Sequence, residues 1–330
     1  MRRRSPDPLE RTFGKVAGLA RIVAITCLFL PAVACAGTPG RGIRVRNLMP
    51  QFWDFWRAAQ DKPADEQLRL WHQLYERPNA AVFADLQGTC AQDLAGDALQ
   101  KQYFPILRQW VPRMRSLSAS LPSTIGSVQE RFVGAFPDMR WSAPIYIMAS
   151  AGCFNGRSQL IAGRKALLLG VDDIVGLGET NLSPLITHEM FHRYHYGYFA
   201  FEPELPQPPW VRLWAEGLAT YVARRLNPTA TNLELMTIDR REIAQLEARL
   251  PSVASDFMSR LNSSLEADAN LYFSDDSGSS RVLPRAGYYL GFRVAEYLGR
   301  QYSMQALAHW SQQEARWHIV AAFRHLIDEK

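Results

Sequence analysis

Two histidines and a glutamate near the middle of the 330-residue chain have the types and the spacing of a metal site. His188, Glu189 and His192 form an H-E-x-x-H pattern. Four residues are about one turn of an α-helix, so both imidazoles would lie on one helix face. There each can give a nitrogen to a zinc ion (Zn²⁺), and Glu189 beside them can accept a proton. The alternative is an amphipathic helix whose two histidines bind no metal.

The residues around this pattern favour a helix. Ser183 can cap its N-terminus, and Pro184 suits the first helical position. Apolar side chains at positions 185, 186, 190 and 191 can bury the sides of the helix. A helix that begins near residue 183 is therefore expected to carry the pattern.

A second predicted helix, at 210–221, offers a third ligand. Glu216 follows His192 by 24 positions across a proline-rich connection, so the two helices can pack side by side. Glu216 would complete a set of two histidines and one glutamate with one position left for water. We expect the small residues Gly217 and Ala219 to let the second helix approach the first. The alternative, an ordinary solvated glutamate, fits poorly with the apolar neighbours of Glu216.

The H-E-x-x-H pattern followed at this distance by E-G-x-A-x-Y, at 216–221, resembles the gluzincin metallopeptidases. It is most similar to a group of predicted zinc-dependent proteases filed as a domain of unknown function. The stretches 52–56, 167–170 and 287–293 resemble that group less specifically. The resemblance implies a zincin-like α+β fold, mostly helical, with a small sheet packed against the H-E-x-x-H helix. Many gluzincins have an Asp four residues after the ligand Glu to orient a histidine, whereas this chain has Thr220.

The resemblance also implies an exported zinc-dependent peptidase that acts on a peptide or protein substrate. Glu189 would be the general base, which takes a proton from water and passes it to the leaving amine. The tetrahedral intermediate carries an oxyanion that a hydrogen-bond donor would stabilise. We expect Tyr289 to be this donor, and Tyr288, Arg285 and His195 are the alternatives. The second hypothesis is a non-catalytic zincin-fold binding or scaffold lipoprotein of the cell envelope.

The N-terminus has the pattern of a signal peptide, residues 1–34. A basic stretch precedes a short apolar core at 22–30 and an Ala-Val-Ala cleavage signal. Cys35 then follows, as in a bacterial lipoprotein, and its lipid would tether the protein to a membrane. Ordinary cleavage, releasing a soluble protein, and an uncleaved anchor helix are the alternatives, although the apolar run is short for a span. Residues 35–44 suit a flexible tether, and the expected location is the bacterial periplasm or cell envelope.

Charge and cysteines agree with export. The chain carries 37 basic and 32 acidic residues, but without residues 1–34 the counts are 31 and 30. Because the remainder is nearly neutral, no nucleic-acid partner is expected. Cys90 and Cys153 can form one disulfide in an oxidising compartment, the alternative being two separate buried thiols.

The rest of the chain is expected to fall into a helical N-terminal region, residues 45–140, and a zincin-like catalytic region, residues 141–330. Expected helices lie at 51–60, 64–75, 97–117, 121–136, 232–250, 286–302 and 304–328, with prolines at 105 and 112 that kink or split the third. Expected strands lie at 144–148, 158–162 and 166–171.

Three further segments have expected roles. In the zincin architecture an edge strand aligns the extended substrate, and residues 150–159 are expected to border that cleft. Asp172 and Asp173 end the last strand and are interpreted as turn residues. The polar stretch 262–284 is expected to be a loop or lid.

Overall fold

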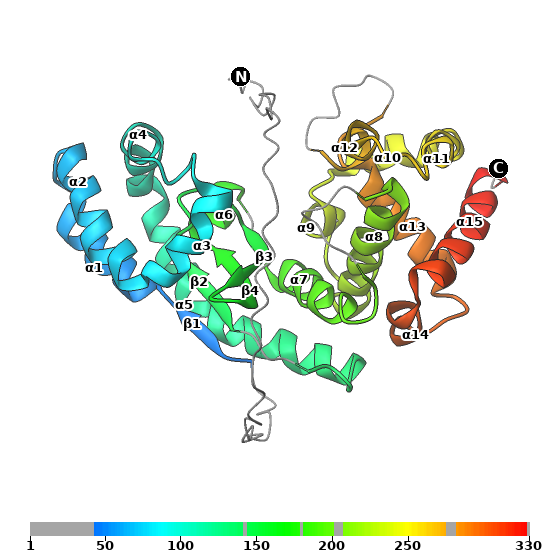
Figure 1. Cartoon of the computed structure of the whole chain (residues 1–330), viewed down its shortest axis with the longest axis horizontal. Coiled ribbons are helices and arrows are strands. Elements are labelled where there is room, and N and C mark those ends of the chain that lie inside the picture. Colours follow the sequence, from blue (N-terminus) through cyan, green and yellow to red (C-terminus); the bar gives the residue numbers. More distant parts are fainter. Residues whose placement is uncertain (1–42, 141–143, 179–180, 201–206, 275–281, 329–330) are drawn as a thin grey trace, which may run out of the picture. The chain divides into compact units, whose positions relative to one another are not determined.

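The computed structural model describes residues 43–140, 144–178, 181–200, 207–274 and 282–328 (Figure 1). The expected signal peptide and Cys35 lie outside these residues, as does 275–281 of the expected lid. None of the helices in the described ranges is both long and apolar enough to cross a bilayer.

The described chain is mostly helical with one small mixed sheet, an α+β fold. The helices are α1 (Met49–Ala59), α2 (Ala64–Trp71), η1 (His72–Glu76), η2 (Arg77–Asn79), α3 (Ala80–Cys90), α4 (Gly96–Ala98), η3 (Leu99–Tyr103), α5 (Phe104–Ala135), α6 (Val171–Gly176), α7 (Ser183–His195), α8 (Pro209–Leu226), α9 (Asn232–Met236), α10 (Arg240–Ala248), α11 (Leu250–Ser259), α12 (Glu266–Phe273), α13 (Ala286–Leu298), α14 (Met304–His309) and α15 (Gln312–Asp328). The strands are β1 (Val45–Asn47), β2 (Ile145–Met148), β3 (Gly156–Ile161) and β4 (Arg164–Gly170).

The sheet has the strand order β1-β2-β4-β3. β1, β2 and β4 are parallel, whereas β3 pairs antiparallel to β4 at the edge. The inner strands β2 and β4 are apolar without alternation, and residues 145–148 and 166–170 are buried. This is the pattern of strands covered on both faces. β3 is only partly buried, in keeping with its position at the edge.

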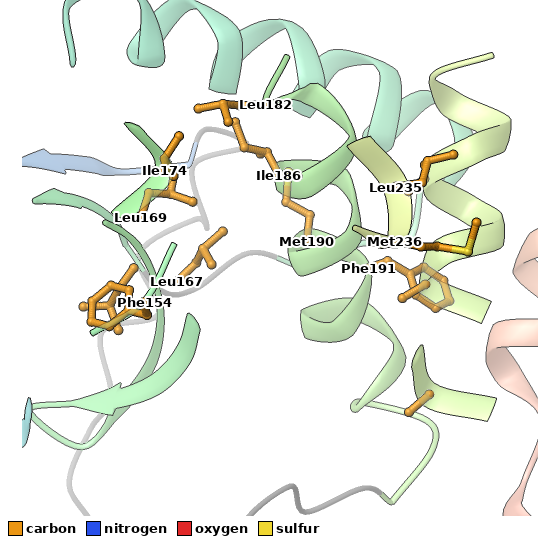
Figure 2. Packing of buried hydrophobic residues seen from close by; sticks show 14 of the residues in the cluster. Phe154, Leu167, Leu169, Ile174, Leu182, Ile186, Met190, Phe191, Leu235 and Met236 are labelled. Atoms are coloured by element: carbon orange, nitrogen blue, oxygen red, sulfur yellow. The ribbon is translucent and has the colours of Figure 1, made fainter. Parts of the chain in front are cut away.

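Helix α7 packs on the sheet through one side and on α9 through another (Figure 2). Ile186 and Met190 lie on the side of α7 that faces Leu167 and Leu169 of β4. Phe191 points the other way, toward α9. These side chains are almost fully buried, so the hydrophobic effect fixes α7 against the sheet. The expected packing of a small sheet against the H-E-x-x-H helix is confirmed.

The expected division of residues 97–136 into separate helices is wrong, because α5 covers Phe104–Ala135 as one helix. It continues through Pro112 and Pro122 as one helix, although each proline removes an internal hydrogen bond. Its buried side chains recur at helical spacing on both sides of the prolines, and this tertiary packing offsets the local cost. They are Phe104, Leu107, Val111, Met114, Ser118, Leu121, Ile125, Val128 and Phe132.

The expected long helix at 232–250 is also wrong. Thr237 has a φ of 55°, in the left-handed region that ends helices, and Asp239 then forms a capping box with Glu242 to begin α10. Strand β1 was not expected at all, because its three residues are exposed and show no apolar pattern. It places the N-terminal region and the following region in one sheet, since β1 pairs with β2.

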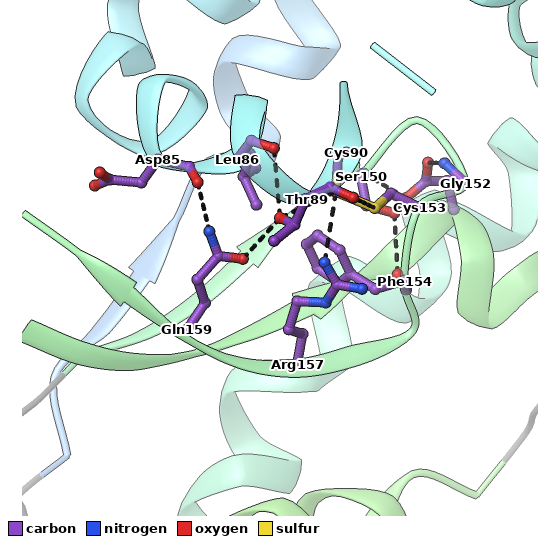
Figure 3. The surroundings of a disulfide bond; sticks show 11 residues. Asp85, Leu86, Thr89, Cys90, Ser150, Gly152, Cys153, Phe154, Arg157 and Gln159 are labelled. Carbon is purple, nitrogen blue, oxygen red and sulfur yellow. Dashed lines mark hydrogen bonds between the residues drawn. A yellow bond between two sulfur atoms is a disulfide. The ribbon is translucent and has the colours of Figure 1, made fainter. Parts of the chain in front are cut away.

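A disulfide joins Cys90, at the end of α3, to Cys153 in the turn between β2 and β3 (Figure 3). Asp172 shapes the same turn, as its buried carboxylate accepts hydrogen bonds from the backbone N–H groups of Ser150 (2.7 Å) and Gly152 (2.9 Å). The disulfide expected from the sequence is therefore at bonding distance. The interpretation of Asp172 as a turn residue that follows the last strand is wrong, because Asp172 lies buried in the first turn of α6 and its hydrogen bonds reach back to the β2–β3 connection.

Reduction of the disulfide is expected to lower the free energy of unfolding by about 2–4 kcal/mol, because the bridge closes a long loop in the unfolded chain. The two cysteines are 63 positions apart. Urea unfolding with and without reductant measures the difference, and the double variant Cys90→Ser/Cys153→Ser should match the reduced protein. Equal stability of the oxidised and reduced protein would contradict the bridge.

Candidate metal centre

Helices α7 and α8 bring the three expected ligands together. His188 and His192 lie one turn apart on α7, and Glu216 lies on α8. Nε2 of His188 is 3.1 Å from Oε2 of Glu216, and Nε2 of His192 is 3.3 Å from the same oxygen. Within the described residues these side chains form a group whose ligand atoms all lie within 4.8 Å of one another. The three side chains therefore come together from the two helices that the sequence predicted to pack side by side.

The spacing of these atoms fits a zinc ion. Zinc binds imidazole nitrogen and carboxylate oxygen at about 2.0–2.2 Å in a tetrahedron, whose edges are then about 3.3 Å. The two nitrogen–oxygen distances, 3.1 and 3.3 Å, match such edges. Two imidazoles and one carboxylate are also a ligand set of catalytic zinc sites that leave one position open. The residues present therefore fit the metal.

Electrostatics within the group favour a charged Glu216. Burial alone would raise its pKa, but His192 and His188 hold the pKa of this carboxyl well below its ordinary value. Burial likewise opposes charging of His192, and Glu216 more than offsets this and raises the pKa of that imidazole. The three side chains are only 7–15% exposed. A buried carboxylate that neutralises two neighbouring histidines is suited to neutralise a cation in their place.

Glu189 lies at the boundary between α7 and the edge strand β3. Oγ of Ser158 is 3.5 Å from Oε2 of Glu189. Gly156, the first residue of β3, leaves room for this side chain, since a Cβ there would lie 3.4 Å from Cγ of Glu189. The expectation that residues 150–159 border the site agrees with these two contacts. The carboxylate is partly exposed and therefore accessible from the side of β3.

Within the described residues, neither an Asp at position 220 nor an acceptor for Nδ1 of His192 is present to orient the candidate ligands. Thr220 is fully buried and donates to the backbone carbonyl of Glu216 at 2.8 Å. Nδ1 of His192 is buried and has no hydrogen-bond partner among the described residues. Metal-binding histidines ordinarily donate this second nitrogen to an acceptor. The orientation of His192 must therefore come from packing, including its stacking on Tyr196 with ring centroids 5.2 Å apart.

His195, an expected ligand or donor, lies outside the ligand group. It is fully buried and stacks between Phe191 and Phe199, with ring centroids 5.2 and 4.9 Å away. Burial, aided by His192, lowers the pKa of this imidazole to about 3, so it is neutral at physiological pH. Neither ring nitrogen has a partner among the described residues.

Two adjacent tyrosines on α13 have different surroundings. The hydroxyl of Tyr289 donates to Glu247 and accepts from Arg293 at 3.1 Å, and no contact joins it to the three ligands within the described chain. Tyr288 is the one coupled to the site. Burial and then the charge of Glu216 raise the pKa of Tyr288 to about 12, against the opposing effect of Arg285 and Arg212. The sequence predicted that both tyrosines lie on one helix. It did not indicate which of them would be affected by the candidate metal ligands.

Gly217 packs on α13 and not on α7, which corrects its expected role. An added Cβ at Gly217 would overlap the backbone of Gly291, and one at Gly291 would lie 2.7 Å from Cα of Gly217. Neither glycine can accept a side chain without moving a helix. This close crossing brings the backbone of α8 at the residue after Glu216 into contact with that of α13, the helix that carries Tyr288.

The full chain, freed of metal and then titrated, is expected to bind one zinc ion. Glu216→Ala should weaken zinc binding by more than about 100-fold, because losing a ligand costs more than losing a group that only orients one. Competition with a chromophoric chelator measures both affinities. Glu130→Ala, an exposed glutamate on α5, is the matched control and should bind as the wild type does. Undiminished binding by Glu216→Ala would place the third ligand elsewhere.

Gly291→Ala is expected to destabilise the protein by about 1–3 kcal/mol and to weaken zinc binding, because the new methyl group forces α8 and α13 apart. Gly126→Ala, in the interior of α5, meets no atom within 4 Å and should instead stabilise by up to about 1 kcal/mol. Thermal unfolding of both variants tests the contrast, and similar effects at the two positions would refute it.

Comparison with known proteins adds no further information about this centre. No family model, no curated protein and no solved structure matches the chain.

Proposed function

We propose that this protein is a zinc-dependent peptidase in which His188, His192 and Glu216 hold the metal and Glu189 is the general base. The observation that carries the proposal is the convergence of both histidine Nε2 atoms on one oxygen of Glu216, at 3.1 and 3.3 Å. A zinc ion in this position would supply Lewis acidity toward a substrate carbonyl and lower the pKa of a water molecule.

Glu189 is suited to move a proton at this site. It occupies the position after the first histidine ligand, and its carboxylate reaches the boundary with β3. From there it would accept a proton from the attacking water and deliver it to the nitrogen of the leaving amine. Partial exposure gives the carboxylate access to water and to a bound peptide.

Strand β3 offers a position for the substrate. It hydrogen-bonds to β4 along one edge, and within the described residues no strand pairs with its other edge. An extended peptide that adds to this edge would pass Ser158 and the carboxylate of Glu189. The scissile bond would then lie next to the general base.

Tyr288 replaces Tyr289 in our proposal as the donor to the oxyanion. Because the pKa of Tyr288 is raised to about 12, its hydroxyl keeps its proton at neutral pH. The charge of Glu216 acts on Tyr288, which supports this choice, whereas the hydroxyl of Tyr289 is held by Glu247. A neutral hydroxyl that donates a hydrogen bond as charge develops on oxygen is a common source of catalytic rate.

A non-catalytic metal-binding protein is the second candidate. Nδ1 of His192 favours it, because this atom has no acceptor among the described residues and a histidine ligand without one is held less firmly. Export to the periplasm or cell envelope is part of either proposal. The Cys90–Cys153 bridge supports it, since structural disulfides persist in oxidising compartments.

Glu189→Gln is expected to abolish peptide hydrolysis while zinc affinity stays within about 3-fold of the wild type, because only the proton acceptor is lost. Tyr288→Phe should lower kcat by about 10²–10³-fold, as does removal of other oxyanion donors, and Tyr289→Phe should have a much smaller effect. Hydrolysis of a peptide library by the zinc-loaded protein measures all three. Retained hydrolysis in Glu189→Gln would refute the mechanism, and stoichiometric zinc without any hydrolysis in the wild type would favour the second candidate.

A further inference from the structure

An arginine with no assigned role lies next to the candidate metal centre. Arg212 precedes Glu216 by four residues on α8, so both side chains leave the same face of the helix. It is partly buried, and its guanidinium carbon lies over the ring of Phe273, 4.9 Å from the centroid. Arg212 and the candidate ligand Glu216 are therefore attached to α8 one helical turn apart.

Three other side chains complete an arginine–aromatic cluster around Arg212, made of Arg212, Phe273, Tyr288 and Arg285. The rings of Phe273 and Tyr288 meet edge to face with centroids 5.7 Å apart, and Arg285 lies 4.4 Å over the ring of Tyr288. Gly287 permits this packing, because a Cβ there would lie 2.5 Å from the ring of Phe273. The cluster connects α8, α12 and α13 beside the site.

The two arginines of the cluster differ in what holds them. Nε of Arg285 donates to the backbone carbonyl of Met236 at 2.8 Å, which fixes this side chain to the start of the α9–α10 turn. Arg212 forms no ion pair with a carboxylate in the described part of the chain. Another partly buried arginine, Arg293, pairs with Glu247 at 3.2 Å and with Glu296 at 3.4 Å. Arg212 is thus a partly buried cation with no carboxylate partner among the described residues.

Glu216 carries the carboxylate nearest to Arg212 along α8, but it is not available as an ion-pair partner for Arg212. Oε2 of Glu216 already lies 3.1 Å from Nε2 of His188 and 3.3 Å from Nε2 of His192, and in a metal-bound protein Glu216 would be a ligand. The contact of Arg212 with an aromatic face stabilises its charge. A hydrogen bond to the side chain of Tyr288 takes one of its five N–H donors, and within the described residues the others can still bind a further partner. A planar guanidinium of this kind binds a carboxylate through two parallel hydrogen bonds.

We propose that Arg212 binds a carboxylate of the substrate beside the scissile bond, so that this site prefers anionic peptides. The carboxylate is either the free C-terminus of the peptide or the side chain of an acidic residue. The inference deepens the proposed function and rests on it, since it concerns the substrate of the same centre. Partial burial strengthens the attraction relative to a fully solvated arginine.

The test uses binding and so does not depend on turnover. Three hydroxamate-capped dipeptides serve as probes: Leu-Ala with a free C-terminal carboxylate, Leu-Ala amide, and Leu-Glu amide. The hydroxamate binds zinc in all three, and calorimetry on the zinc-loaded full chain measures each Kd. We expect one or both anionic probes to bind about 10- to 100-fold more tightly than Leu-Ala amide, the range of a charge-assisted hydrogen bond. Which probe gains identifies the source of the carboxylate.

Arg212→Gln is expected to abolish this preference and to leave the Kd of Leu-Ala amide unchanged. Arg212→Lys should retain part of the preference, because it keeps the charge but loses the planar fork. Arg225→Gln is the matched control, an exposed arginine on the same helix, and should behave as the wild type does. An equal loss of affinity for the neutral and the anionic probes in Arg212→Gln would indicate a structural role and overturn the proposal.

The outcomes separate this inference from the proposed function. Equal binding of the three probes by the wild type refutes a role of Arg212 in recognition and leaves the peptidase intact. Failure of every probe to bind refutes both. A preference for anionic probes in a protein that hydrolyses no peptide supports carboxylate recognition and refutes only the catalytic proposal.

Discussion

Contact between the backbones of Gly217 and Gly291 determines where the parts of the candidate site lie. With no side chain between them, α8 and α13 cross closely enough for Glu216 on one and Tyr288 on the other to interact. The hydrophobic face of α7 supplies the second constraint, because Ile186 and Met190 hold that helix against the sheet. Both constraints come from packing away from the candidate ligands, so the fold can hold these side chains in place before any metal binds.

The sequence predicted the ligand set because its information is local. Two histidines one turn apart share a helix face in any fold, and a glutamate in an apolar helix must find a partner. The general position of the strands was also predictable, since residues 145–148 and 166–170 form apolar runs bounded by turn residues. These features depend on neighbours within a few residues.

What the sequence did not predict depends on tertiary contacts. Three exposed residues form β1 only because β2 offers an edge, and α5 passes through Pro112 and Pro122 only because a continuous apolar face is buried on both sides of them. The choice between Tyr288 and Tyr289 is of the same kind. Two adjacent residues on a helix point about 100° apart, and only the crossing with α8 decides which one meets Glu216.

Arg212 shows how a residue with a proposed role in binding escapes detection in a sequence. An isolated arginine in a helix is ordinarily a solvated side chain, and the four-residue spacing from Arg212 to Glu216 does not by itself show that Arg212 is buried. The structure separates them, because Arg212 is partly buried against Phe273 and lies one turn from Glu216, whereas Arg225 is exposed. Partly burying a charge that has no carboxylate partner among the described residues costs solvation energy. A bound carboxylate would offset that cost, and the cost is the physical reason to expect one.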